Sequence, residues 1–148
     1  MIDTHEMHAR ERRYLARLAK LIFACATFIL VLNLIGAIGS VIAGPIYERM
    51  QMRGGGGPHV PYQWGVALCF VNAVGAYVAR KGRPFLGSMV LFLAGIAGLS
   101  LIMFYIGTIH WSAIAWYFWQ PVVLWLLLAL FAWGSIKAEN LAQAGDAG

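Results

Sequence analysis

Charged residues are scarce in this sequence, and one long stretch has none. Only 11% of the 148 residues are Asp, Glu, Lys or Arg, while 61% are hydrophobic. Residues 84–136, 53 positions in all, contain none of the four charged residue types. Such a tract is too long for one membrane helix and suits two helices joined by a tight turn. It also lacks the charged side chains from which proton relays and ion sites within membranes are built.

Acidic residues and cysteines are also few, which limits the chemistry that the chain can perform. The uncharged tracts hold no carboxylate pair, nucleophile–base pair or cluster with metal-ligand spacing, so the sequence predicts no catalytic residue and no metal site. Cys25 and Cys69 have no CxxC neighbour and fall within apolar tracts. We interpret them as small buried hydrophobic residues.

Two further uncharged tracts precede the long one, at residues 21–47 and 54–79. Each is long enough for one spanning helix of about 20 residues. Because lipid offers no hydrogen-bond partners, the backbone must satisfy its polar groups inside helices. The sequence therefore predicts an all-α membrane protein, a four-transmembrane-helix bundle in one domain over residues 21–137. The expected spans cover about 18–44, 61–80, 84–107 and 112–136.

The basic residues gather on one side of these four predicted spans. Nine of the 11 Lys and Arg precede the first span, fill the turn after the second or follow the fourth, whereas Arg49 and Arg53 alone fall on the other side. This positive-inside pattern predicts that both termini are cytoplasmic. We expect an integral protein of a bacterial inner membrane. No module for binding nucleic acid accompanies the basic charge.

The two ends of the chain are polar. Residues 1–20 predict a short basic amphipathic helix that runs into the first span at the headgroup level. Its cations are expected to face anionic lipid, at about 1 kcal/mol each, with docking of a soluble partner as the alternative. These lipid-facing cations are Arg10, Arg13, Arg17 and Lys20. Residues 138–148 are expected to form a short, loose polar tail, and Gly44 and Pro45 to end the first spanning helix.

Small and polar residues recur on one face of the first and second spans. Gly36, Ser40 and Gly44 form a small-residue ladder of the kind that lets membrane helices approach closely. Asn33 and Asn72 fall within the spans, and we expect each amide to bond inside the bundle, through separate partners. With Ser40 they are interpreted as packing residues, each hydrogen bond contributing about 0.6 kcal/mol. The alternative is a polar path for a substrate or ion.

The fourth span is rich in tryptophan. Its outer end resembles an aromatic belt at a membrane interface, and Pro121 is expected to kink the helix. Residues 124–130 contain almost no small side chain and are expected to face lipid or a partner. The tryptophans assigned to that outer face are Trp111, Trp116, Trp119 and Trp125.

His59 and His110 are the two histidines expected near the outer membrane surface. They are weak candidates for a haem or quinone site, because haem-binding histidines in helical bundles usually project inward from the spans, and we favour ordinary interfacial histidines. The sequence otherwise predicts no cofactor.

The pattern as a whole favours a small noncatalytic subunit of a larger respiratory, photosynthetic or transport assembly. Its expected partners are the lipid bilayer and other membrane subunits or further copies of the chain. Two alternatives remain open: a self-associating channel or transporter with a polar path near Asn33 and Asn72, and a haem or quinone protein that uses His59 and His110.

Overall fold

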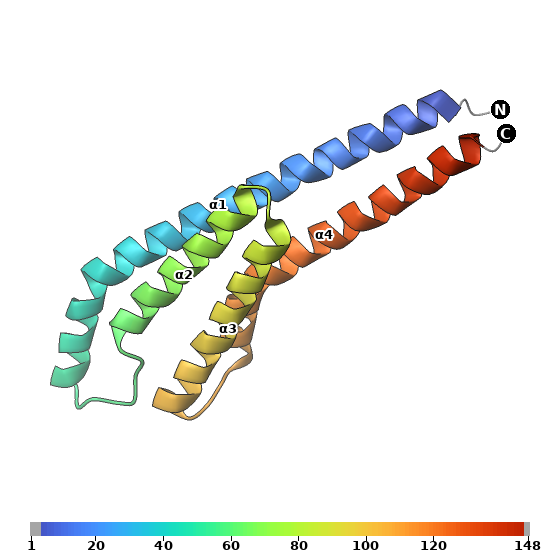
Figure 1. The fold of residues 1–148 in the computed structure, drawn as a ribbon. Coiled ribbons are helices and arrows are strands. Elements are labelled where there is room, and N and C mark those ends of the chain that lie inside the picture. Colours follow the sequence, from blue (N-terminus) through green and yellow to red (C-terminus); the bar gives the residue numbers. More distant parts are fainter. Residues whose placement is uncertain (1–3, 147–148) are drawn as a thin grey trace.

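The computed structural model describes residues 4–146, and this part of the chain folds into four helices with no strand (Figure 1). Each helix is long and apolar enough to cross a membrane. The all-helical, four-helix prediction is therefore confirmed. The helices are α1 (Thr4–Arg53), α2 (Tyr62–Arg80), α3 (Pro84–Ile106) and α4 (Trp111–Asp146).

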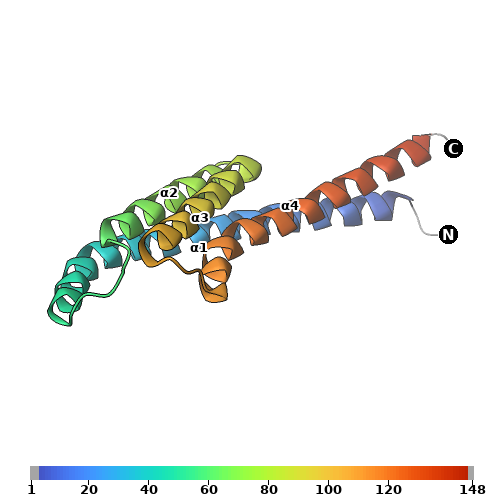
Figure 2. The ribbon, with the colours of Figure 1, turned by 90° about the horizontal axis from the view of Figure 1, so that it is seen from below.

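The four helices form an antiparallel bundle. Each packs against its neighbour along the chain, and α4 returns to pack against α1 (Figures 1 and 2). Short connections at 81–83 and 107–110 join the last three helices, while residues 54–61 link α1 to α2. This is the up-down arrangement that short loops between successive helices favour.

The first helix does not end at Gly44 and Pro45, as the sequence suggested. It continues through Pro45 to Arg53 and changes direction in its last third (Figure 1). A proline inside a helix removes one backbone hydrogen bond and bends the axis, but the turns on either side keep their bonds. Pro121 lies inside α4 in the same way, and α4 also bends in its first third (Figure 2).

The two polar ends form one projecting structure. The expected short helix at 1–20 is the first part of α1, and the expected loose tail is helical to Asp146. Residues 1–3 and 147–148 of these two segments lie outside the described part. Beyond the 81–83 turn, the two helix ends continue side by side toward the termini (Figures 1 and 2). We call residues 4–17 and 134–146 the helical stalk.

Close contacts hold the base of the stalk together. A Cβ on Gly134 would lie 3.1 Å from Leu15 Cδ2 and 3.2 Å from Tyr14 Cε1, so the helices touch at this glycine. Lys137 Nζ lies 3.3 Å from Glu11 Oε1. The 138–146 segment continues α4 as a helix beyond these contacts with α1.

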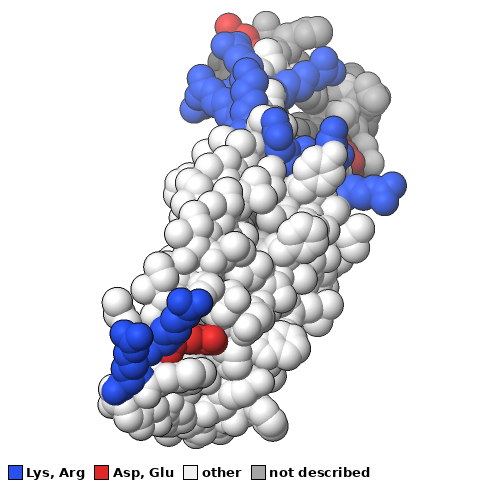
Figure 3. Space-filling model, turned by 90° about the vertical axis from the view of Figure 1, so that its left-hand side faces the viewer, with Lys and Arg blue, Asp and Glu red and all other residues white. Residues whose placement is uncertain are grey.

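The charged residues lie at the two ends of the molecule, with an uncharged band between them (Figure 3). At the end near the termini, Arg80 at the close of α2 stacks its guanidinium 4.9 Å from the centre of the Phe23 ring. We call this the basic end. The opposite end carries the 54–61 connection together with Arg49 and Arg53, and we call it the loop end.

Small residues bring the helices together. A Cβ on Gly36 would lie 3.2 Å from Cys69 Sγ, and one on Gly44 would lie 2.5 Å from the Tyr62 ring. The predicted ladder on α1 is therefore the surface that meets α2. Between α2 and α3 the backbones themselves come close, because a Cβ on Gly87 would lie 2.6 Å from Ala79 N.

The core corrects one expectation about α4. Leu124 is fully buried and packs in a cluster with Ile29 of α1 and Leu91 of α3. The segment 124–130 was expected to face outward because it has few small residues. Its first residue instead closes the centre of the bundle, since α4 meets α1 as well as α3.

Candidate functional site

A buried pair of amides joins α1 to α4. Asn33 Nδ2 donates to Gln120 Oε1 at 3.0 Å and to the Ile29 carbonyl at 2.8 Å. Each amide side chain is only 5% exposed. The sequence suggested that Asn33 bonds inside the bundle, but it did not identify Gln120 as the partner.

The structure does not bring the candidate polar-path residues together. Asn72 is half-buried on α2, and its amide has no hydrogen-bond partner among residues 4–146. Ser40 lies at the α1–α2 contact, with its Oγ 4.0 Å from where a Cβ on Gly65 would sit. At the level of Asn33, the bundle is closed by Ile29 and Leu124, which have no exposed surface. Neither Asn33 nor Asn72 lines any of the four main cavities of the described residues.

The four tryptophans predicted for the outer face divide into two pairs. Trp111 is 84% exposed and Trp116 is 60% exposed, so both lie on the surface. Trp119 is half-buried against the core and 6.4 Å from the Phe28 ring. Trp125 is also half-buried and donates its Nε1–H to Ser88 Oγ at 2.8 Å. The last two therefore also pack within the bundle.

The predicted lipid-facing cations lie on the stalk and at its base. Arg10, Arg13 and Arg17 share one face of α1 and line an open cavity there with Glu6 and Tyr14. All three arginines are exposed. Lys20 is exposed one turn further along, close to the level at which Ala19 and Phe23 meet the 81–83 turn.

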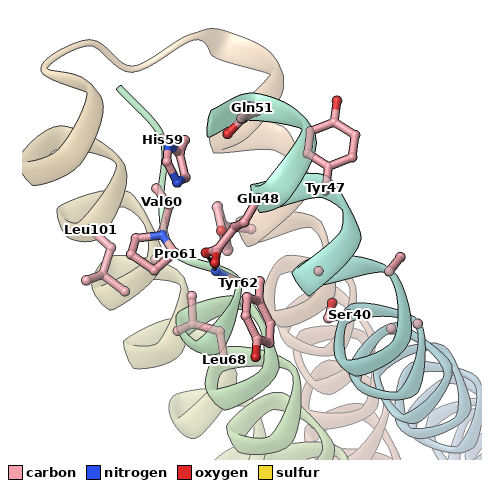
Figure 4. Close-up of a pocket in the computed structure, with 17 residues that line it drawn as sticks. Ser40, Tyr47, Glu48, Gln51, His59, Val60, Pro61, Tyr62, Leu68 and Leu101 are labelled. Carbon is pink, nitrogen blue, oxygen red and sulfur yellow. Dashed lines mark hydrogen bonds between the residues drawn. The ribbon is translucent and has the colours of Figure 1, made fainter. Parts of the chain in front are cut away.

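A cavity of about 600 Å³ opens at the loop end, and we call it the vestibule (Figure 4). All four helices and the end of the 54–61 connection contribute to its wall. Figure 4 shows Glu48 and His59 projecting into the same space. The residues that define the vestibule here are Glu48, His59, Tyr62, Leu68, Leu101 and Tyr117.

Glu48 was not identified as a site residue from the sequence. Its Oε1 accepts a hydrogen bond from the Tyr62 backbone N–H at 3.0 Å and so ties the end of α1 to the first turn of α2. A carboxylate there satisfies a free N–H of the helix terminus and interacts favourably with the helix dipole. The sequence could have pointed to Glu48 in one way: it is the only Asp or Glu between residues 12 and 138.

The structure separates the two histidines suggested for haem or quinone. His59 lines the vestibule, and its Nδ1 lies 3.1 Å from the Gly57 carbonyl oxygen. His110 is exposed in the 107–110 connection and is not part of the vestibule wall. Among the side chains described, residues 6–145, no group of three or more His, Cys, Asp or Glu is placed to hold a metal ion.

The fold and the site together describe a small all-helical protein with four helices able to span a membrane, a closed polar pair at its centre and one open vestibule. Comparison with known protein families, with characterised proteins and with solved structures found no match.

Proposed function

We propose that this chain is a noncatalytic integral membrane subunit of a larger assembly in a bacterial inner membrane. The basic end and both termini face the cytoplasm in this proposal. The observation that carries it is the helical stalk, which extends the bundle well beyond the length that a bilayer requires. The lipid bilayer and other membrane subunits are the partners.

The lengths of the first and last helices, α1 and α4, support this role. At about 1.5 Å per residue, the 50 residues of α1 extend about 75 Å and the 36 residues of α4 about 54 Å. The hydrocarbon core of a bilayer is only about 30 Å thick. The 19-residue α2 and the 23-residue α3 match that thickness, so the surplus of α1 and α4 is available for contacts outside the membrane.

The charge on the stalk favours a protein partner at its far end. Arg10 and Arg13 lie about 10–15 Å along the helix from Lys20, which is at the level of the 81–83 turn. The attraction of anionic lipid falls off within a Debye length, about 8 Å at physiological salt. Arg17 and Lys20 therefore remain near the headgroups. Arg10 and Arg13 lie beyond them and form ion pairs with an acidic surface of another subunit.

The interior of the bundle supports a structural role over transport by a single copy. Ile29 and Leu124 are fully buried at the centre, and the Asn33 amide is already bonded to Gln120. A buried amide whose hydrogen bonds are satisfied packs helices together. A path through this level would have to break that pair.

We expect the full-length chain, extracted from its native membrane in mild detergent, to co-purify with other membrane subunits. Replacing Arg10 and Arg13 by glutamate should reduce the recovery of those subunits by about tenfold. Each arginine contributes an exposed ion pair worth up to about 1 kcal/mol, and reversal adds repulsion. The measurement is quantitative mass spectrometry of the purified material.

The matched control is Arg49→Glu with Arg53→Glu, the same charge change on the same helix at the loop end. It should leave recovery of the partner subunits unchanged. If the wild-type chain emerges alone or only with copies of itself, the proposal of a larger assembly is wrong. If the stalk variant keeps its partners in full, the stalk is not the contact.

A further inference from the structure

The vestibule is open to the outside and has the dimensions of a site for a small molecule. Its volume of about 600 Å³ falls within the range of about 300–1,000 Å³ that ligand pockets occupy. Its wall combines Tyr62 and Leu68 of α2, Leu101 of α3 and Tyr117 of α4 with the bent end of α1. Gly39 lies on the α1 side of the wall, and a Cβ added there would meet nothing within 4 Å.

The charge inside the vestibule is negative. Glu48 supplies a carboxylate, and among the described residues of the wall none is Lys or Arg. Arg49 and Arg53 are exposed and fall about 100° and 140° around the helix from Glu48, on the side away from Ser40 and Gly44. The Glu48 carboxylate is therefore not paired with its neighbours on α1, and no ion pair to it exists within residues 4–146.

Glu48 and His59 each leave one polar atom without a partner in the described residues. Glu48 Oε1 is occupied by the Tyr62 N–H, but Oε2 has no hydrogen-bond partner within residues 4–146. His59 Nδ1 must carry the proton in its bond to the Gly57 carbonyl oxygen, because a carbonyl can only accept. In the neutral imidazole the other ring nitrogen, Nε2, is then an acceptor. Figure 4 shows both side chains directed into the vestibule, with Gln51 at its outer edge.

The rest of the wall is apolar or aromatic. Leu68 and Leu101 lie on the inner side of the polar groups, next to the glycine-rich surface of α1. Tyr62 and Tyr117 add aromatic rings to the wall, and these rings pack against Gly44 and Gly98. A ligand that fills the vestibule must therefore have one end that donates hydrogen bonds to the carboxylate. The rest of the ligand must be apolar.

We propose that the vestibule binds an amphipathic ligand with a primary ammonium head and an apolar body. The ammonium group donates to Glu48 Oε2 and to His59 Nε2, and the body extends between Leu68 and Leu101. The same chemistry is found in amine-headed membrane lipids and in free lipophilic amines. This inference does not depend on the role of the chain in a larger assembly.

Glu48 also has a structural role, as the cap of α2, and the test must separate that role from ligand binding. Glu48→Gln keeps an oxygen acceptor for the Tyr62 N–H but removes the negative charge. Glu11→Gln is the matched control, because it removes a carboxylate of the same type from the stalk. Gly39→Leu is a second variant, and its larger side chain narrows the vestibule. A Cβ at this position meets nothing within 4 Å, so the helix itself is not disturbed there.

The experiment measures saturable binding of radiolabelled dodecylamine to the full-length chain in phosphatidylcholine nanodiscs, above the background of empty discs. Wild type and Glu11→Gln should bind the amine with the same affinity, and neither should bind dodecanol saturably. Glu48→Gln should bind at least about tenfold more weakly, since hydrogen bonds to charged groups contribute about 1.5–3 kcal/mol. Gly39→Leu should also weaken binding.

Absence of saturable dodecylamine binding to the wild-type chain would overturn the proposal, as would equal affinity in Glu48→Gln. If Glu48→Gln fails to fold, unchanged binding by a folded Gly39→Leu would overturn it instead. Adding phosphatidylethanolamine to the discs identifies the source of the amine. Loss of dodecylamine binding would assign the site to an amine-headed lipid, and retained binding would assign it to a free lipophilic amine.

Discussion

Replacing Gly87 by leucine is expected to destabilise the bundle by about 3 kcal/mol, because the new side chain has no space between α2 and α3. A Cβ at this position would lie 2.6 Å from both Ala79 Cβ and Ala79 N, and it would also clash with the Gly75 carbonyl oxygen. Two of these three neighbours are backbone atoms, which cannot rotate away. The helices must separate, and lipid offers no hydrophobic drive to bring them back together.

Unfolding of the purified chain in mixed micelles, titrated with a denaturing detergent, measures this loss. Gly39→Leu is the matched control, because it makes the same chemical change in the middle of a spanning helix where a Cβ meets nothing within 4 Å. The control should unfold within about 0.5 kcal/mol of wild type, as surface changes usually do. Equal stability of the two variants would show that α2 and α3 do not meet at Gly87.

Asn33→Leu is expected to cost about 2 kcal/mol, more than the lost hydrogen bond alone. An average hydrogen bond between membrane helices contributes about 0.6 kcal/mol. Leaving a buried partner unsatisfied adds about 1–3 kcal/mol, and Gln120 is only 5% exposed. Gln120→Leu should cost a similar amount for the same reason. The same unfolding titration measures both.

The double variant Asn33→Leu/Gln120→Leu tests whether the two amide side chains interact. It should be more stable than the sum of the two single changes predicts, because no unpaired amide remains in the core. Strictly additive losses would mean that the two side chains do not share the bond at 3.0 Å. Flux through wild-type chains in liposomes that disappears in Asn33→Leu would instead support the channel alternative.

The positions of the four helices could be predicted from the sequence, because uncharged tract length is a direct consequence of bilayer thickness. Pro61 and Pro84 marked the starts of α2 and α3, where a proline is tolerated. The helix over residues 4–20 was expected, but the continuation of α1 past Pro45 and the helical end of α4 were missed. Polarity at residues 138–146 was taken as a reason for loose structure, although Ala, Glu, Leu and Gln, which favour helices, make up most of that segment.

The candidate site was harder to predict, since it depends on how each helix is rotated about its own axis. Asn33 and Gln120 are 87 residues apart, and nothing in either local pattern pairs them. Glu48 was overlooked for a related reason. With α1 expected to end at Gly44, the carboxylate belonged to a loop, and only the helix that continues through Pro45 carries it over the first turn of α2.

We propose that all four helices cross the membrane with both ends of the chain in the cytoplasm. Labelling of single cysteines with a membrane-impermeant maleimide tests it, after Cys25 and Cys69 have been replaced by alanine. In intact cells, Gly57→Cys at the loop end should react and Gln143→Cys in the stalk should not. Permeabilised cells should label both. Reaction of Gln143→Cys in intact cells, or protection of Gly57→Cys there, would contradict the four-span arrangement and the cytoplasmic stalk.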